Sequence, residues 1–247
     1  MKVAPARQWP WMAAALAAVV SCAAGSAAWH FTLAQALNDT ARRGENVLQL
    51  AASTLSGQLD RFERLPALIA GQPIVQNLVA DPENNALVAE ANAYLAQIQS
   101  QLDASDVYLM SIDGLTIAAS NHASATSFIG GNFAFRPYFF EAMRGGTGRF
   151  YALGTTSRKR GYYFGAPVTA KGQISGVLAF KIDLDAIEKT WRGGDYAVLV
   201  TDPDGVIFLS SREEWLFQAL HPLSAEGRTR IATTRRYADT EIGLLVD

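Results

Sequence analysis

The chain has 247 residues, which is enough for one or two domains, and its 21 basic residues nearly balance its 23 acidic ones. Without a strongly basic field, nucleic acid is excluded as the expected partner. Cys22 is the only cysteine and lies in an apolar segment, so a small fold held by disulfides is excluded as well.

The N-terminal part of the chain is apolar. Residues 8–38 contain no Asp, Glu, Lys or Arg, and Trp9 and Trp29 flank their most apolar stretch. A helix needs about 20 apolar residues to cross the hydrocarbon core, and tryptophans favour the two membrane interfaces. The pattern predicts a transmembrane helix over residues 9–33, with residues 1–8 in the cytoplasm.

The charges that precede this span set its expected orientation. Lys2 and Arg7 favour a cytoplasmic N-terminus, which predicts a single-pass protein of a bacterial inner (plasma) membrane with residues 35–247 in the periplasm. Two alternatives stay open, namely a cleaved signal peptide that ends near residues 23–25 and a lipoprotein-type box at residues 19–22.

A long helix is predicted to continue from the span, because apolar or small residues recur at steps of three and four. They are Leu33, Leu37, Thr40, Gly44, Val47, Ala51, Leu55, Leu59 and Phe62. This stripe pairs with a second copy, which predicts a homodimer through the stalk helix, or packs against the following domain; the two interpretations are compatible. Pro66 is expected to end or bend the helix, and further helices with a turn at Asp81-Pro82 complete a helical connector over residues 34–105.

Alternating and β-branched residues begin at Asp106 and predict five strands. Their ranges are about 106–112, 115–120, 148–153, 161–169 and 173–182. Asp113-Gly114 and Lys171-Gly172 are expected to form tight turns, and a loop with a short helix near Pro137 separates the second and third strands. The pattern predicts a membrane-distal PAS-like unit with an antiparallel sheet over residues 106–192.

The pattern of the first two strands recurs later in the chain. The sequence "VYLMSIDGLTIAAS" at residues 107–120 resembles "VLVTDPDGVIFLSS" at residues 198–211. After a helix at residues 184–191, a second, membrane-proximal PAS-like unit is predicted over residues 193–247, short or truncated. The expected fold class is therefore α/β (α+β), with a transmembrane helix and a long stalk helix followed by two tandem PAS-like units.

Alternation along the strand at residues 173–182 places Lys181 on a face of small residues, which leaves a hollow beside its ammonium group. In a PAS-like unit, Arg136 and the hairpin "GTTS" at residues 154–157 fold over that same face. Two separated cations with nearby hydroxyl groups suit a small dianion, since a guanidinium binds a carboxylate in bidentate geometry. We therefore expect a pocket for a small dicarboxylate ligand.

The expected ligand-binding residues are Arg136, Tyr138, Tyr151, Thr155, Thr156, Ser157, Tyr163 and Lys181. For each tyrosine taken alone, packing in the core is the simpler interpretation. The adjacent charges of residues 158–160 are expected to be solvated. Asp183 falls on the face of Lys181 by alternation, so an amino-acid ligand, whose ammonium group needs an acidic partner, stays open.

These residues also carry a resemblance. The motifs "FRPYF", "ALGTTS", "GYYF" and "AFK" in residues 135–181, with "VLVTDPDGVIFLSS" after them, resemble the periplasmic sensor region of the DctB family over nearly the whole chain. That family comprises membrane-bound sensor histidine kinases that detect C4-dicarboxylates. The resemblance implies a double PAS-like fold of the PDC or dCache type, a dimerising helix and ligands of the succinate type. By motif, it implies ligand contacts from Arg136, Thr155, Ser157 and Lys181.

The sequence departs from a complete kinase. It has no second long apolar run and no glycine-rich nucleotide loop, and His30, His122 and His221 are isolated. We expect a chain that senses without phosphorylating, truncated before a kinase part that would use ATP and a response regulator. No cofactor is expected in the chain itself.

The sequence also bears on two other classes of function, an enzyme and a sensor with a different output. The acidic pairs Asp183/Asp185 and Asp202/Asp204 are attributed to a helix cap and a turn rather than to a metal site, and no catalytic triad or zinc-ligand spacing is present. A chemoreceptor or another output protein with the same sensor fold, which binds a different small carboxylate or an amino acid, remains an alternative.

Overall fold

The computed structural model describes residues 9–245, and the predicted cytoplasmic residues 1–8 lie outside the described part of the chain. Contacts divide the chain into two compact units, Met1–Ala51 and Ala52–Asp247. The helix α1 (Trp9–Glu63) has 55 residues and passes from the first unit into the second.

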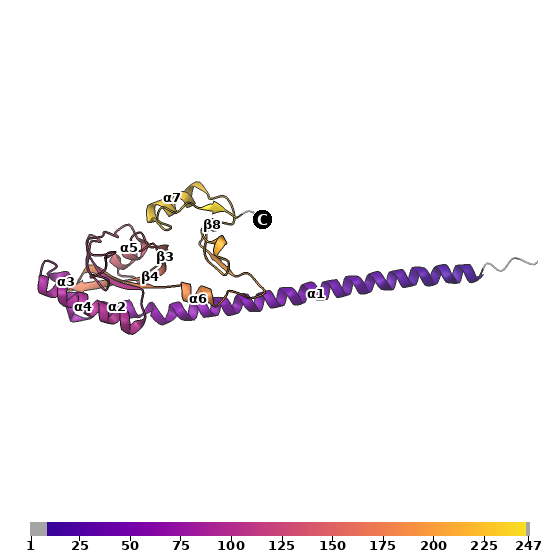
Figure 1. The fold of residues 1–247 in the computed structure, drawn as a ribbon, viewed down its shortest axis with the longest axis horizontal. Helices are drawn as coiled ribbons and strands as arrows, with labels where there is room; N and C mark the ends of the chain where they lie inside the picture. The colour runs from indigo at the N-terminus through magenta and orange to yellow at the C-terminus, as the bar shows by residue number, and fades with distance from the viewer. Residues whose placement is uncertain (1–8, 246–247) are drawn as a thin grey trace, which may run out of the picture. The chain divides into compact units, whose positions relative to one another are not determined.

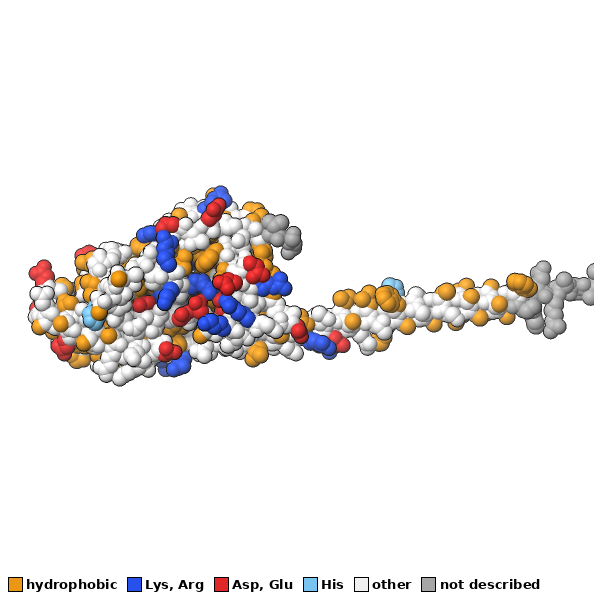
Figure 2. Space-filling view, in the orientation of Figure 1, with side chains coloured by type: hydrophobic (Ala, Val, Ile, Leu, Met, Phe, Trp, Pro, Cys, Tyr) orange, Lys and Arg blue, Asp and Glu red, His pale blue; other side chains and the backbone are white. Residues whose placement is uncertain are grey.

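In the first unit, α1 presents apolar side chains such as Trp11, Leu16 and Trp29 on its surface (Figure 2). It is the one helix among the described residues that is long and apolar enough to cross a membrane, with a mean hydropathy of 1.7 over its most apolar part. The apolar N-terminal helix that the sequence predicts is therefore present.

In the second unit, the C-terminal part of α1 packs against the sheet. Phe62 is buried, and its ring centroid lies 5.8 Å from that of Phe180. Leu59 and Leu55, one and two turns earlier on the same face, are half-buried. The interpretation that the stripe packs against the following domain is confirmed for this part, and pairing with a second copy stays a prediction.

Three shorter helices follow, as the sequence predicts. They are α2 (Leu65–Ala70), α3 (Pro73–Ala80) and α4 (Asn85–Leu102). Pro66 lies in the first turn of α2, where its missing N–H costs nothing. Asn84 caps α4 by accepting hydrogen bonds from the backbone N–H groups of Ala86 and Leu87.

The five predicted strands form one antiparallel sheet. They are β1 (Asp106–Ser111), β2 (Thr116–Ala119), β3 (Gly148–Leu153), β4 (Arg160–Ala170) and β5 (Gln173–Ile182), in the order β2-β1-β5-β4-β3. Figure 1 shows α2, α3 and α4 on one side of this sheet and α5 (Pro137–Met143) on the other. The sheet therefore has two covered faces.

Alternation along β5 sorts its side chains between these faces. Phe180 faces α1, whereas Val177 and Ala179 face an aromatic cluster under α5. The cluster includes Tyr108, Phe128, Phe133, Tyr138, Phe139, Phe150 and Tyr163. Lys181, two positions after Ala179, extends the row of small residues to the end of the strand, as the sequence analysis predicted.

The C-terminal segment, residues 193–245, follows the helix α6 (Asp185–Lys189). Its elements are β6 (Leu199–Thr201), β7 (Ile207–Ser210), the 3₁₀ turn η1 (Glu213–Trp215), β8 (Gln218–Ala219), α7 (Ala225–Thr234) and β9 (Gly243–Leu244). β6 and β7 pair antiparallel, whereas β8 and β9 form a short parallel pair that the sequence pattern did not indicate.

The hairpins β1–β2 and β6–β7 are structural copies of each other. Tyr108 pairs with Ala119 in the first, and Leu199 pairs with Ser210 in the second. In both hairpins the register shifts one pair further along, after Leu109 in the first and after Val200 in the second. The glycine of each Asp-Gly turn has a positive φ, of 80° and 81°. The internal repeat that the sequence predicts is confirmed at the level of register.

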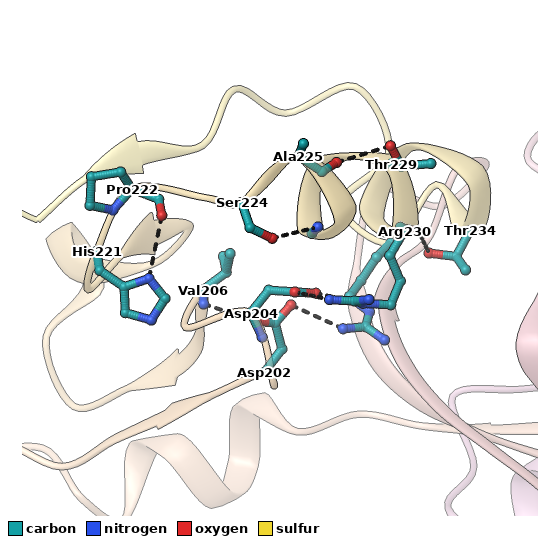
Figure 3. A network of polar contacts seen from close by, with 12 residues as sticks. Asp202, Asp204, Val206, His221, Pro222, Ser224, Ala225, Thr229, Arg230 and Thr234 are labelled. Carbon is teal, nitrogen blue, oxygen red and sulfur yellow. Dashed lines mark hydrogen bonds and ion pairs between the residues drawn. The ribbon is translucent and has the colours of Figure 1, made fainter.

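α7 is joined to the turn of the second hairpin (Figure 3). Ser224 caps the helix by accepting from the N–H of Gly227 at 2.9 Å, and Arg230 forms an ion pair with Asp204. Asp202 holds the turn itself, because its Oδ1 accepts from the N–H groups of Asp204 and Val206.

Candidate ligand-binding site

A buried lysine near the end of β5 is the first cationic group of the candidate site. Lys181 is 0% exposed and lies opposite Asp106 of β1 and Tyr163 of β4 in the sheet register. Its Nζ donates to Asp106 Oδ2 at 3.4 Å and to Ser157 Oγ at 3.1 Å, and lies 5.7 Å from the centre of the Tyr163 ring. Burial lowers the pKa of Lys181, and the Asp106 carboxylate opposes that effect.

A glycine leaves room for the lysine side chain. A Cβ atom on Gly161 would lie 2.5 Å from Lys181 Cε and 2.9 Å from Lys181 Cγ. Any other residue at this position of β4 would push the lysine away from its place between Asp106 and Ser157.

A buried arginine forms the second cationic group. Arg136, 2% exposed, directly precedes α5, and its guanidinium lies over the rings of Phe135 and Phe150. Nη1 donates to the carbonyls of Thr234 and Arg235, at 3.1 and 3.0 Å, and Nη2 donates to that of Leu153 at 3.1 Å. Three carbonyls thus stabilise the buried charge from one side.

The hydroxyl groups come from the hairpin between β3 and β4. The N–H of Gly154 donates to the carbonyl of Lys159, and the N–H of Arg158 donates to that of Gly154, each at 3.0 Å. These bonds close a short loop that carries Thr155, Thr156 and Ser157, with Thr156 exposed and the other two half-buried.

These groups border a small cavity of about 10 Å³. It is lined by Tyr108, Phe128, Phe133, Arg136, Tyr138, Gly154, Thr155, Thr156, Ser157 and Tyr163. Six of the eight predicted residues therefore meet at one cavity, and Lys181 joins them through its bond to Ser157. A space of this size holds roughly one water molecule.

Two of the predicted tyrosines form a wall of the cavity. The rings of Tyr138 and Tyr163 are stacked with centroids 5.3 Å apart, and the hydroxyl groups of Tyr138 and Tyr108 lie 2.6 Å apart. Burial raises the pKa of Tyr138 to about 12, and it raises the pKa of Tyr163 as well. Both phenols therefore stay neutral and are able to donate hydrogen bonds at neutral pH.

Tyr151 lies elsewhere, contrary to the expectation. Alternation along β3 turns Phe150 into the aromatic cluster and Tyr151 to the opposite side, where its ring stacks on Phe208 at 3.8 Å. Its hydroxyl group accepts from Arg236. Tyr151 belongs to the contact between β3 and the C-terminal segment.

The basic triplet at residues 158–160 does not behave as one solvated group. Arg160 is largely buried and forms a bidentate pair with Glu188, at 2.9 and 2.7 Å, with further bonds to Asp185 and the carbonyl of Phe208. Arg158 and Lys159 are exposed, as expected, and Arg158 lies 3.6 Å from Asp239. The expectation of solvation is wrong for Arg160.

The acidic partner of Lys181 is Asp106 and not Asp183. Asp183 is exposed and lines a separate open cleft of about 680 Å³, between the end of α1 and α6. Asp183 Oδ1 accepts from the N–H of Asp185, but the N-cap of α6 is Leu184 and no side chain caps this helix, so the expected helix cap is not formed. Asp202 does form the predicted turn, and the described residues contain no cluster of metal-ligand type.

The sequence did not point to three residues that line the cavity, Tyr108, Phe128 and Phe133, or to Asp106, the partner of Lys181. Tyr108 and Asp106 were foreseeable, because in an antiparallel pair the start of β1 lies opposite the end of β5, and both share the face of Lys181. Phe128 and Phe133 lie in the loop after β2. A loop has no regular alternation of side chains, so the sequence pattern could not predict which side they face.

No family model matches the chain. Individual relatives and solved structures do match it, and they show its family. The chain is 45% identical over 191 residues to the C4-dicarboxylate transport sensor protein DctB of Pseudomonas aeruginosa, which covers 77% of this chain and 31% of that protein. The crystal structure of the V. cholerae histidine kinase DctB sensor domain superposes with a TM-score of 0.79 and 35% identity, over 83% of this chain and 79% of that one. The chain belongs to the DctB sensor-domain family.

The DctB match covers the sensor part, since the chain spans about a third of the length of the curated relatives that it matches. A more distant neighbour is the ligand-binding domain of the Campylobacter jejuni chemoreceptor Tlp3, solved with 4-methylisoleucine. Its TM-score is 0.53 at 18% identity, over 69% of this chain and 68% of that one. This likeness concerns the fold alone, which DctB sensor domains share with a chemoreceptor.

Proposed function

We propose that the chain is the extracytoplasmic sensor region of a two-component sensor histidine kinase and that it binds a C4-dicarboxylate of the succinate, malate or fumarate type. One observation carries the proposal. Two buried cations, Arg136 and Lys181, flank the hairpin that carries Thr155, Thr156 and Ser157.

Each cation has capacity left for a carboxylate. The carbonyl bonds of Arg136 engage Nη1 and Nη2, and no acceptor among the described residues is bonded to Nε. A carboxylate on that edge would accept two parallel hydrogen bonds. The second carboxylate would accept from Lys181 Nζ and from the hydroxyl groups of Thr155 and Ser157. Anchors at the two ends of the ligand favour a dianion over a monoanion.

Binding requires the hairpin to move, because a four-carbon dianion is many times larger than the present cavity of about 10 Å³. The tip of the hairpin is held to the C-terminal segment by the exposed pair of Arg158 and Asp239. Exposed pairs contribute little, about 0–1 kcal/mol. Its base is fixed more firmly, through the ion pair of Arg160 with Glu188. We infer that the tip opens while the base stays in place.

In this proposal the protein is anchored in the bacterial inner membrane by α1 and acts as a homodimer through the stalk helix. Ligand binding shifts the balance between two arrangements of that helix, by no more than the difference in affinity for the two. The signal then passes to a kinase part, which uses ATP and a response regulator.

A sensor of a chemoreceptor or another output protein that binds an amino acid is the second candidate, and Asp106 is the observation in its favour. Its carboxylate, beside Lys181, offers a partner for a ligand ammonium group, which a simple dicarboxylate does not need. The two candidates predict different ligands for the same cavity.

Calorimetry on the purified chain in detergent tests the proposal. We expect heat of binding with succinate, malate or fumarate, and none with leucine or valine. Lys181→Met should abolish the heat, whereas Lys189→Met, an exposed lysine on α6, should leave it unchanged. Thermal melts of both variants report whether they remain folded. Absence of heat with every dicarboxylate would reject the proposal, and heat with amino acids alone would favour the second candidate.

A further inference from the structure

A strained turn after α7 contacts the candidate binding site through its backbone. Arg235, the C-cap of α7, and Ala238 have φ values of 48° and 53°, in the left-handed region that non-glycine residues rarely adopt. The carbonyls of Thr234 and Arg235 accept from Arg136 Nη1. Strain of this kind persists only where the surroundings hold it, and it gathers at functional sites.

These carbonyl bonds orient the arginine. The last carbonyls of a helix lack partners within the helix and carry partial negative charge, so they attract a guanidinium. Both of these bonds engage Nη1 of Arg136, and the bond to Leu153 engages Nη2. Because the guanidinium is planar, fixing Nη1 and Nη2 also fixes the direction of the Nε edge.

The turn is held in place by residues that do not line the cavity. Asp202 Oδ2 accepts from Arg236 Nη1 at 3.0 Å and from the Tyr237 hydroxyl at 2.8 Å. The Arg236 guanidinium lies over the ring of Phe150 at 4.9 Å. The backbone carbonyl of Arg236 accepts from the N–H of Leu153, which directly precedes the hairpin.

α7 is held independently at an earlier turn. Asp204, in the same hairpin turn as Asp202, forms an ion pair with Arg230 (Figure 3). The C-terminal segment thus presents α7 and its terminal carbonyls to Arg136 as one connected element.

We propose that the turn at residues 235–237 is a positioning element of the ligand site, which orients Arg136 so that its Nε edge receives the ligand. The inference rests on the proposed function. Arg236 and Tyr237 act through Arg136 and do not touch the ligand. Docking of the turn and binding of the ligand therefore stabilise each other, and this coupling is reciprocal.

The first experiment measures ligand affinity in variants of the turn. In the full chain, Arg236→Ala should weaken succinate binding about 5-fold or more, as expected for coupled sites. Arg236→Lys, which keeps a cation beside Asp202, should recover part of the loss. Arg228→Ala, which removes an exposed arginine of α7, is the matched control and should leave the affinity unchanged.

The second experiment uses hydrogen exchange on the wild-type chain, which needs no variant to fold. Succinate should slow exchange of the backbone amides at residues 231–238, an effect that a turn with a merely structural role would not show. Equal affinity of the wild type and Arg236→Ala, or unchanged exchange at residues 231–238 on saturation, overturns the inference while the proposed function stands. Absence of succinate binding by the wild type overturns the proposed function, and the inference with it.

Discussion

Lys181 and Asp106 lie directly opposite each other on β5 and β1, with Nζ 3.4 Å from Oδ2. The lysine is fully buried, and a buried charge needs a partner. The ammonium group that a ligand carboxylate would contact is therefore already paired with the carboxylate of Asp106. Asp106 raises the pKa of Lys181 and so affects the pH at which the site loses its positive charge. Its carboxylate also offers a partner for the ammonium group of an amino-acid ligand, which a lysine alone would not.

Replacing Asp106 with asparagine should change the pH profile of binding. Burial lowers the pKa of Lys181 and Asp106 raises it, so without Asp106 the pKa of Lys181 falls further. A dicarboxylate needs the charged lysine, which is lost as pH rises through its pKa. Succinate affinity in Asp106→Asn should therefore decline at a lower pH than in the wild type. Titration calorimetry at a series of pH values below the usual lysine pKa of 10.5 measures the two profiles, and superimposable profiles would contradict this reasoning.

Gly161→Ala should impair binding more than stability. The new Cβ would lie 2.5 Å from Lys181 Cε, so the flexible side chain must shift away from Asp106 and Ser157. We expect succinate affinity to fall at least about 10-fold, which corresponds to 1.4 kcal/mol. Gly172→Ala is the contrasting control for the ligand site, because a Cβ there meets nothing within 4 Å although its φ of +78° costs backbone strain. Equal affinities for Gly161→Ala and the wild type would show that the position of Lys181 is not critical.

The ion pair of Arg160 with Glu188 should contribute to the stability of the second unit. Glu188 is 0% exposed, and Arg160→Met would leave its charge with only the exposed Arg192, at 3.7 Å, and the N–H of Ser210. Breaking a buried pair in this way costs about 3–5 kcal/mol. Arg192→Met is the matched control, because this exposed arginine lies 3.7 Å from the same carboxylate and contributes about 0–1 kcal/mol. Urea unfolding of the two variants checks the difference, and similar midpoints would mean that the buried pair contributes little.

Acid should weaken the same contact. Burial alone would raise the pKa of Glu188, but hydrogen bonds from Arg160 and from the backbone N–H of Ser210 hold the pKa below its usual value of 4.5. Because the folded-state pKa is the lower one, the stabilisation is complete above pH 4.5 and is lost as pH falls through the folded value. Glu188→Gln should be less stable than the wild type at pH 7, and its stability should depend less on pH below 4.5. Parallel acid-unfolding curves would exclude this assignment.

Local periodicity was sufficient for much of this protein. The five strands of the main sheet, the turns at Asp113-Gly114 and Lys171-Gly172, and the break of the long helix at Pro66 were all predictable. Alternation along β5 also placed Lys181 on the face of small residues. These features depend on side-chain types at fixed short spacings, which the sequence displays directly.

What the sequence by itself determined is therefore the elements of the main sheet, the helices that precede it and the face of β5 on which Lys181 lies. Only the tertiary structure decided the partners of the charges: Asp106 rather than Asp183 for Lys181, Glu188 for Arg160, and the carbonyls of α7 for Arg136. The reason is physical. Faces follow from the period of a single element, whereas partners depend on strand register and on contacts between segments far apart in the chain, where one residue of slip exchanges every neighbour.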